Sequence, residues 1–207
     1  MQKVNEWEQA NFKTDFSRIG IREDELSLTW DAIKPNVSDG IKALKAVKPA
    51  YERGWGMVFL WGPWGQAKTL VGKILTATSY RDNKRGAYAN MSSVLDDIRL
   101  AFDEQEHKTT ELLRRIDWWI GRDVLFLDEL DKSNSSTPWA QERIFQLLDQ
   151  RYARAIRQEA LTVIASNSSN AELDGYLKSR LNDRRLGPVV YLNGTDGRQV
   201  VPDEWRF

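Results

Sequence analysis

The segment GPWGQAKT, residues 62–69, carries glycine, lysine and threonine in an order that can bind phosphate. Glycines let successive backbone N–H groups turn toward a phosphate, and the N-terminus of a following helix adds its positive dipole end. In such a loop Lys68 reaches the β- and γ-phosphates and the Thr69 hydroxyl binds Mg²⁺. Ala67 takes the place of a third glycine, and we expect it to be tolerated with a negative φ. The alternative is a glycine-rich turn without a ligand.

Two acids close an apolar run further along the chain, in VLFLDEL, residues 124–130. The run predicts a buried strand, and ligands of open α/β sheets bind at the carboxyl ends of such strands. Adjacent strand residues point to opposite sides. We therefore assign Asp128 to Mg²⁺ and Glu129 to the general base that activates a water. The alternative is a pair of strand-end acids at a solvent-exposed edge.

Two further polar groups extend this pattern. Asn167 ends the apolar run LTVIASN, and its carboxamide can orient a water against the γ-phosphate, although alone it is more typical of a cap or turn. Arg180 and Arg184 follow in KSRLNDRR. An arginine supplied to a neighbour's γ-phosphate stabilises transition-state charge, whereas spacing alone favours a solvated basic turn.

These residues need a sheet to bring them together. Strands are predicted at residues 56–62, 86–91, 124–130, 161–167 and 189–192. Helical patterns lie between them: one begins at Ser38, one follows Lys68, Ser92 caps a third, Gly121 stops a fourth, and Thr137 with Pro138 opens a fifth. Strands that alternate with helices predict an α/β fold, a parallel sheet of five strands covered on both faces. Residues 1–26 are expected to form an arm or the remnant of a longer region, and residues 27–207 the domain.

Composition narrows the class of protein. The chain has 207 residues, with 30 Lys plus Arg and 30 Asp plus Glu, so its net charge does not predict a nucleic-acid partner. It has no cysteine and a single histidine, His107, which excludes disulfides, thiolate metal sites and a histidine-rich metal site. No signal peptide and no long apolar run are present, so we expect a cytoplasmic protein without a membrane partner.

Taken in order, the motifs resemble those of AAA+ ATPases. GPWGQAKT resembles Walker A, VLFLDEL resembles Walker B, VIASN resembles sensor 1 and LKSRL resembles the arginine-finger element. The wider match is to the DnaC/DnaI-type helicase loaders and the related IstB-type transposition ATPases. That group carries a tryptophan-containing helix, an Arg–Tyr pair and a strand that ends in Ser–Asn, which match Trp139, Arg151–Tyr152 and Ser166–Asn167.

This resemblance implies a P-loop NTPase of the AAA+/ASCE type with a reduced or absent lid, which uses ATP and Mg²⁺. It also implies a head-to-tail homo-oligomer, a ring, spiral or filament, that hydrolyses ATP between subunits. The implied partners are single- or double-stranded DNA and a replicative helicase or a transposase. The site residues carried over are Gly62, Pro63, Trp64, Gly65, Gln66, Ala67, Lys68, Thr69 and Leu70 for the nucleotide, Thr69 and Asp128 for Mg²⁺, and Glu129, Asn167 and Arg180 for catalysis.

Other positions match less closely. Arg184 is the alternative finger, Trp30 and Asp31 match the segment near adenine, and Arg198 is a candidate for sensor 2. The helix equivalent to the DNA-contacting one, from Ser92 to about Lys108, is acidic on balance. Arg81, Lys84 and Arg85 form a better basic cluster, and the nine tryptophans suit packing more than base stacking.

Three rival functions remain open. A nucleotide-dependent scaffold or filament on DNA, with little hydrolysis, is motivated by Ala67 and by the missing lid. A small-molecule kinase shares the phosphate loop, but the acids with Asn167 favour water as the acceptor. A pure protein-interaction module is disfavoured by the intact Lys68, Thr69 and Asp128.

Overall fold

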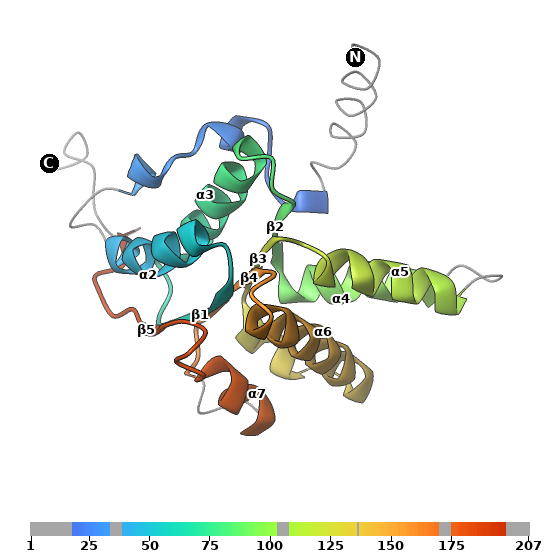
Figure 1. The fold of residues 1–207 in the computed structure, drawn as a ribbon. Helices are drawn as coiled ribbons and strands as arrows, with labels where there is room; N and C mark the ends of the chain where they lie inside the picture. Colours follow the sequence, from blue (N-terminus) through green and yellow to red (C-terminus); the bar gives the residue numbers. More distant parts are fainter. Residues whose placement is uncertain (1–17, 34–38, 103–107, 136, 170–174, 198–207) are drawn as a thin grey trace, which may run out of the picture.

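The computed structural model describes residues 18–33, 39–102, 108–135, 137–169 and 175–197, and a five-stranded sheet lies at its centre (Figure 1). The strand order is β2-β3-β4-β1-β5, and every pairing between neighbours is parallel. The predicted α/β fold with a five-stranded parallel sheet is confirmed. The strands are β1 (Gly56–Trp61), β2 (Gly86–Asn90), β3 (Val124–Asp128), β4 (Leu161–Ser166) and β5 (Val189–Tyr191).

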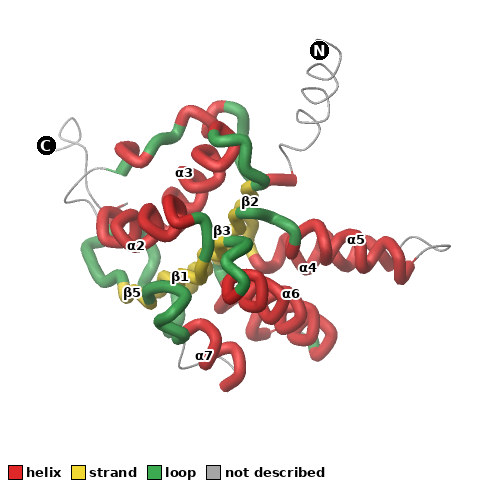
Figure 2. The backbone as a smooth tube through the Cα atoms, viewed as in Figure 1, coloured by secondary structure: helices red, strands yellow, loops and turns green. Residues whose placement is uncertain are grey.

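Helices cover both faces of this sheet, as Figures 1 and 2 show. They are α2 (Gly40–Arg53), α3 (Lys68–Arg81), α4 (Met91–Arg99), α5 (Lys108–Ile120), α6 (Pro138–Ile156) and α7 (Gly175–Leu181). Helices α2 and α3 pack on one face, where Val58 of β1 and Phe126 of β3 join their apolar side chains. Helices α4 to α7 pack on the other face, around Phe59 and Leu125. Because neighbouring strand residues point to opposite faces, each apolar strand supplies both cores.

Local signals fix where the helices begin. Thr137 caps α6 as predicted, since its hydroxyl accepts a hydrogen bond from the Ala140 N–H, and Pro138 is the first helical residue. The predicted cap at Ser92 is wrong: α4 begins at Met91, with Asn90 at the N-cap position. Strand β2 runs directly into α4, so no residue is left for a separate turn. The predicted start of α2 at Ser38 lies outside the described residues.

The segment before α2 belongs to the packed structure. Ile19 and Ile21 are buried in the core on the α4 side. Two short 3-10 helices follow, η1 (Asp24–Ser27) and η2 (Trp30–Ala32). The domain boundary near residue 26 stays a prediction. None of the described helices is long and apolar enough to cross a membrane.

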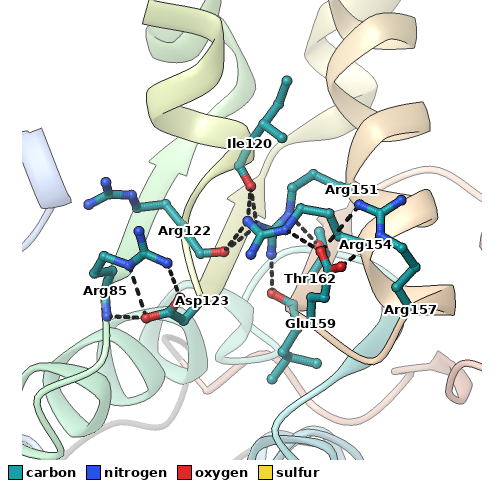
Figure 3. A network of polar contacts seen from close by, with 10 residues as sticks. Arg85, Ile120, Arg122, Asp123, Arg151, Arg154, Arg157, Glu159 and Thr162 are labelled. Atoms are coloured by element: carbon teal, nitrogen blue, oxygen red, sulfur yellow. Dashed lines mark hydrogen bonds and ion pairs between the residues drawn. The ribbon is translucent and has the colours of Figure 1, made fainter. Parts of the chain in front are cut away.

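The amino end of the sheet is held by a buried arginine, Arg151 of α6 (Figure 3). Its guanidinium donates to Thr162 Oγ1 and to the Ile120 carbonyl, each at 2.8 Å, to the Leu161 carbonyl at 2.5 Å, and to the Arg122 carbonyl. Burial lowers the pKa of Arg151 to about 9. These hydrogen bonds tie α6, β4 and the turn before β3 together. Arg151, the first residue of the Arg–Tyr pair noted in the sequence, therefore has a structural role.

Candidate active site

The chain turns sharply between β1 and α3, and Gly62, Gly65 and Ala67 all have positive φ there, at 145°, 78° and 58°. The expectation of a negative φ at Ala67 is therefore wrong. With ψ at 18°, Ala67 lies in the left-handed region directly before the first residue of α3. Here the chain reverses from loop into helix within one residue. A residue with a Cβ pays roughly 1–2 kcal/mol for this conformation, which glycine would avoid.

Close packing explains the two glycines of the loop. A Cβ on Gly62 would lie 1.9 Å from the Leu192 carbonyl oxygen, and one on Gly65 would lie 1.7 Å from Asp196 Oδ1. The segment after β5, residues 192–197, thus lies directly against the phosphate loop, and Gly197 N–H donates to the Gly65 carbonyl at 3.1 Å. The loop glycines are required by this contact as well as by their φ.

Gln66 fixes the loop from inside. Its side chain is 1% exposed, and its Nε2 donates to the Gly194 carbonyl at 2.7 Å. Its Oε1 accepts from the Asp39 N–H at 3.1 Å. Gln66 therefore connects the loop to the start of α2 and to the segment after β5. The sequence gave no signal for this scaffold role, because both partners lie far along the chain.

Lys68 and Thr69 begin α3 beside the end of β3. Lys68 is 7% exposed, and its Nζ donates to the carbonyls of Gly62 at 2.5 Å and Pro63 at 2.8 Å. The ammonium group thus lies within the curve of the loop. Thr69 Oγ1 donates to Asp128 Oδ2 at 2.7 Å. Two residues that the sequence assigned to one metal ion are therefore in direct contact.

Asp128 is the centre of a buried polar cluster. It is 3% exposed, and its Oδ1 accepts from the Glu129 N–H at 2.9 Å. The Tyr88 hydroxyl lies 3.0 Å from Asp128 Oδ2 and 3.0 Å from Asn90 Oδ1. Burial and then the charge of Asp128 raise the pKa of Tyr88 above its ordinary value. Sequence reasoning missed Tyr88, because no local pattern indicates that its strand lies beside the strand that ends in Asp128.

Glu129 leaves the strand in the opposite direction. It has a φ of 55°, and its carboxylate forms an ion pair with Lys132, one turn further along η4 (Leu130–Ser135). Its side chain is 27% exposed, so water can reach the carboxylate. The two strand-end acids thus have different environments, with Asp128 buried beside Thr69 and Glu129 open to the solvent side.

Asn167 follows β4 and contacts an acid that the sequence did not single out, Asp131. The Asn167 N–H donates to Asp131 Oδ1 at 2.8 Å, and its Nδ2 lies 3.2 Å from Asp131 Oδ2. Burial opposes ionisation of Asp131, but the hydrogen bonds from Asn167 and Ser166 outweigh it and lower the pKa of Asp131. Asp131 therefore fixes the carboxamide that was expected to orient a water.

These groups line one cavity of about 820 Å³. Its floor is the loop from Trp64 to Leu70, with Asp128, Glu129 and Asn167 on one wall. The opposite wall comes from the segment before α2. The residues of that segment that line the cavity are Arg22, Asp24, Glu25, Leu28, Ala32 and Ile33. Trp30 packs against Tyr51, with ring centroids 5.9 Å apart. Trp30 and Asp31, which were expected near adenine, do not line the cavity, but their apolar neighbours Leu28, Ala32 and Ile33 do.

Arg180 does not line this cavity. It lies on α7, where its guanidinium donates to Asp149 Oδ1, at 2.6 Å from Nη2 and 3.0 Å from Nε. Its Cζ is 3.4 Å from the ring centroid of Tyr176. Arg184, the alternative finger, is exposed. The sensor 2 candidate Arg198 and the single histidine, His107, lie outside the described residues.

Comparison with known proteins gives the family. Residues 58–188, more than half of the chain, match the model of the "ATPase family associated with various cellular activities (AAA)". The chain therefore belongs to this family, and the resemblance inferred from its motifs is confirmed. No curated protein matches the sequence.

Solved structures share the fold. The crystal structure of DnaI has 18% identity and a TM-score of 0.61, over 86% of this chain and 95% of that one. The DnaC helicase loader has 20% identity and a TM-score of 0.57, over 83% and 99%. The AMPPCP-bound DnaA from Aquifex aeolicus has 18% identity and a TM-score of 0.62, over 81% of this chain and 54% of that one. The chain thus spans about half the length of that DnaA structure.

The residues present fit a nucleotide with Mg²⁺. Gly62, Gly65 and Ala67 have positive φ in the loop that leads into the N-terminus of α3, and turns of this kind expose backbone N–H groups that bind phosphate. Asp128 and Thr69 present a carboxylate and a hydroxyl, the oxygen ligands that Mg²⁺ prefers. No cluster of three or more His, Cys, Asp or Glu side chains that could hold a metal is found among the described residues.

Proposed function

We propose that this chain is an ATPase that binds ATP with Mg²⁺ in the cavity at the carboxyl end of its sheet and hydrolyses it. The observation that carries this proposal is the 2.7 Å contact between Thr69 and Asp128 beside the Lys68 loop. It brings a helix-start hydroxyl and a strand-end carboxylate to one point, from segments far apart in the sequence. A chance glycine turn would not need this partner.

Each residue then has a defined task. Loop N–H groups and Lys68 bind the phosphates, and Lys68 exchanges its loop carbonyls for phosphate oxygens. Thr69 and Asp128 would hold Mg²⁺, which would supply positive charge against the charge that develops on the phosphates. Once the Glu129 carboxylate has left its ion pair with Lys132, it accepts a proton from the attacking water. Asn167, held by Asp131, orients that water.

We infer that the active form is a head-to-tail homo-oligomer, a ring, spiral or filament. Arg180 does not reach its own cavity, which supports a role at the γ-phosphate of a neighbouring subunit, where an arginine stabilises transition-state charge. The similarity of fold to DnaI, DnaC and DnaA supports a task in the cytoplasm on single- or double-stranded DNA, as a loader or recruiter of a replicative helicase or a transposase.

A second function is a nucleotide-dependent scaffold on DNA with little intrinsic hydrolysis. The ion pair between Glu129 and Lys132 favours it, because the carboxylate must be released from Lys132 before it can accept a proton from water. The rate of ATP hydrolysis by Lys132→Ala separates the two functions. If the ion pair restrains an ATPase, the rate rises in this variant; if the protein is a scaffold, the rate stays low.

Equilibrium binding of a fluorescent ATP analogue tests the first proposal. Lys68→Ala is expected to weaken binding at least about tenfold, as loss of a charge-assisted contact implies. Lys48→Ala is the matched control, because Lys48 is an exposed lysine of α2 that makes no hydrogen bond or ion pair with any described residue. Equal affinity in the two variants would remove the basis of the proposed site.

A further inference from the structure

The basic cluster that the sequence suggested for DNA is occupied by contacts within the protein. Arg81 donates to the carbonyls of Leu26 and Leu28. Arg85 forms an ion pair with Asp123 at 2.6 Å (Figure 3). Lys84 Nζ lies 4.1 Å from the centroid of the Tyr51 ring. Of this cluster, Arg85 is paired with an acid, and Arg81 and Lys84 contact carbonyls and a ring within the protein.

The helices after β2 are no better suited. Each arginine that α4 and α5 carry in the described residues forms an ion pair with an acid of the same two helices. The pairs are Arg99 with Asp96 at 3.4 Å, Arg114 with Glu111 at 2.6 Å, and Arg115 with Asp97 at 2.7 Å. Their charges largely cancel, and phosphate binding depends on charge that is not cancelled.

Three cations gather along a groove between α2 and the edge strand β5. The groove has a volume of about 550 Å³. Lys42, Lys45 and Arg53 line it, and among the described residues no acidic side chain does. Its floor is apolar, with Pro49 of the helix facing Val190 of the strand. Figure 1 shows α2 and β5 side by side at one edge of the molecule.

The three cations are differently held. Lys45 is exposed and has no hydrogen bond or ion pair with any described residue. Lys42 Nζ donates to the Tyr191 carbonyl at 2.5 Å and lies 3.8 Å from Asp39 Oδ2. Within the part of the chain that the structure describes, Arg53 donates to the carbonyls of Trp55 at 3.1 Å and Leu186 at 2.7 Å and pairs with no acid. The groove therefore keeps a net positive charge.

An aromatic platform stands at the end of the same groove. Tyr191 is 44% exposed, and its ring stacks on Trp61 with centroids 4.1 Å apart and an angle of 25° between the planes. One face of the Tyr191 ring is thus supported by Trp61. An exposed ring supported in this way can stack with a nucleic-acid base.

We propose that the α2–β5 groove binds single-stranded DNA, with Lys42, Lys45 and Arg53 facing its phosphates and Tyr191 stacking on one base. The proposal deepens the proposed function, because it names the surface that holds DNA. Lys42 and Lys45 are three residues apart on α2, about 4.5 Å along the helix axis, so both can follow one backbone. In a duplex the faces of the bases are stacked on one another, so duplex DNA could contact the cations of the groove but not stack on Tyr191.

An acidic peptide is the rival occupant, and the geometry of the edge disfavours it. An extended peptide would bind by adding a strand to β5. However, β5 has only three residues, Pro188 before it has no N–H, and Lys42 already occupies the Tyr191 carbonyl. Short edge strands, proline and lysine are the features that prevent strand addition.

Fluorescence anisotropy of a labelled oligothymidylate, without nucleotide, tests the proposal. Lys45→Glu is expected to weaken binding about tenfold, and Lys45→Gln is expected to reduce the salt dependence by about 0.7 in the log–log slope, which is one phosphate contact. Tyr191→Leu keeps a cover over Trp61 and is expected to weaken binding about fivefold or more without changing the salt slope.

The matched control is Lys48→Glu, which makes the same change of charge on α2 outside the groove. Equal losses for Lys45→Glu and Lys48→Glu, or a labelled polyglutamate that binds in place of the oligonucleotide, would overturn the proposal. Because no nucleotide is present, the oligonucleotide binding measured here does not depend on ATP hydrolysis. If the groove proposal is wrong, ATP binding that requires Lys68 is still expected. If the ATP-site proposal is wrong, DNA binding that requires Lys45 is still expected.

Discussion

Restoring glycine at position 67 tests whether the phosphate loop has the backbone that the structure gives it. Ala67 has a φ of 58°, and the left-handed conformation costs a residue with a Cβ roughly 1–2 kcal/mol. Glycine removes that cost but gives the unfolded chain more freedom, worth roughly 0.4–1 kcal/mol. Ala67→Gly is therefore expected to stabilise the protein by about 0.5–1 kcal/mol, or about 1–4 °C in Tm.

Thermal unfolding and nucleotide affinity are measured together. Affinity is expected to stay within about twofold, because the loop already has the conformation that glycine would allow. Gln158→Gly is the matched control, since Gln158 is exposed, has a φ of 61° and lies outside the cavity. It should give a similar gain in stability. A loss of stability in Ala67→Gly, with a gain in Gln158→Gly, would refute the left-handed conformation of Ala67.

Three further substitutions test other contacts. Arg151→Met removes the guanidinium from the Leu161 carbonyl and the Thr162 hydroxyl, while Arg154 still donates to the carbonyls of Ile120 and Arg122. It is expected to lower the free energy of unfolding by about 3–5 kcal/mol in urea titration, and a loss below about 1 kcal/mol would contradict the network. Asp149→Asn weakens the partner that positions Arg180, so turnover should fall about threefold with ATP affinity unchanged, and equal turnover would show that Asp149 has no such role. The hydrogen bonds to Asp131 lower its pKa below the ordinary value for an aspartate, so its contribution to stability is present above the unfolded-state pKa and is lost as pH falls through the folded-state pKa. The stability difference between wild type and Asp131→Asn should therefore shrink on acidification, and a difference that persists would contradict this assignment.

The parts of the fold set by local pattern were predictable. Apolar runs gave the five strands, and their shared direction placed Asp128 and Asn167 at one edge because the ends of parallel strands meet there. Thr137 and Pro138 marked the start of α6 because capping depends on neighbours in the sequence.

The contacts that complete the site were not predictable, because they join segments far apart in the sequence. Gln66 contacts residues 39 and 194, and Tyr88 contacts residue 128. No local pattern indicates either pair. The prediction of a negative φ at Ala67 was wrong for the same reason. The residue type alone favours a negative φ, but the loop packs against the segment after β5, and Ala67 adopts the left-handed conformation there.

ATP hydrolysis by the purified chain, with and without single-stranded DNA and beside Lys68→Ala, is the most direct test of the central claim. We predict turnover that requires Lys68 and rises when DNA is added. Turnover that is unchanged in Lys68→Ala would contradict the claim, since no hydrolysis at this site can proceed without the lysine of its phosphate loop.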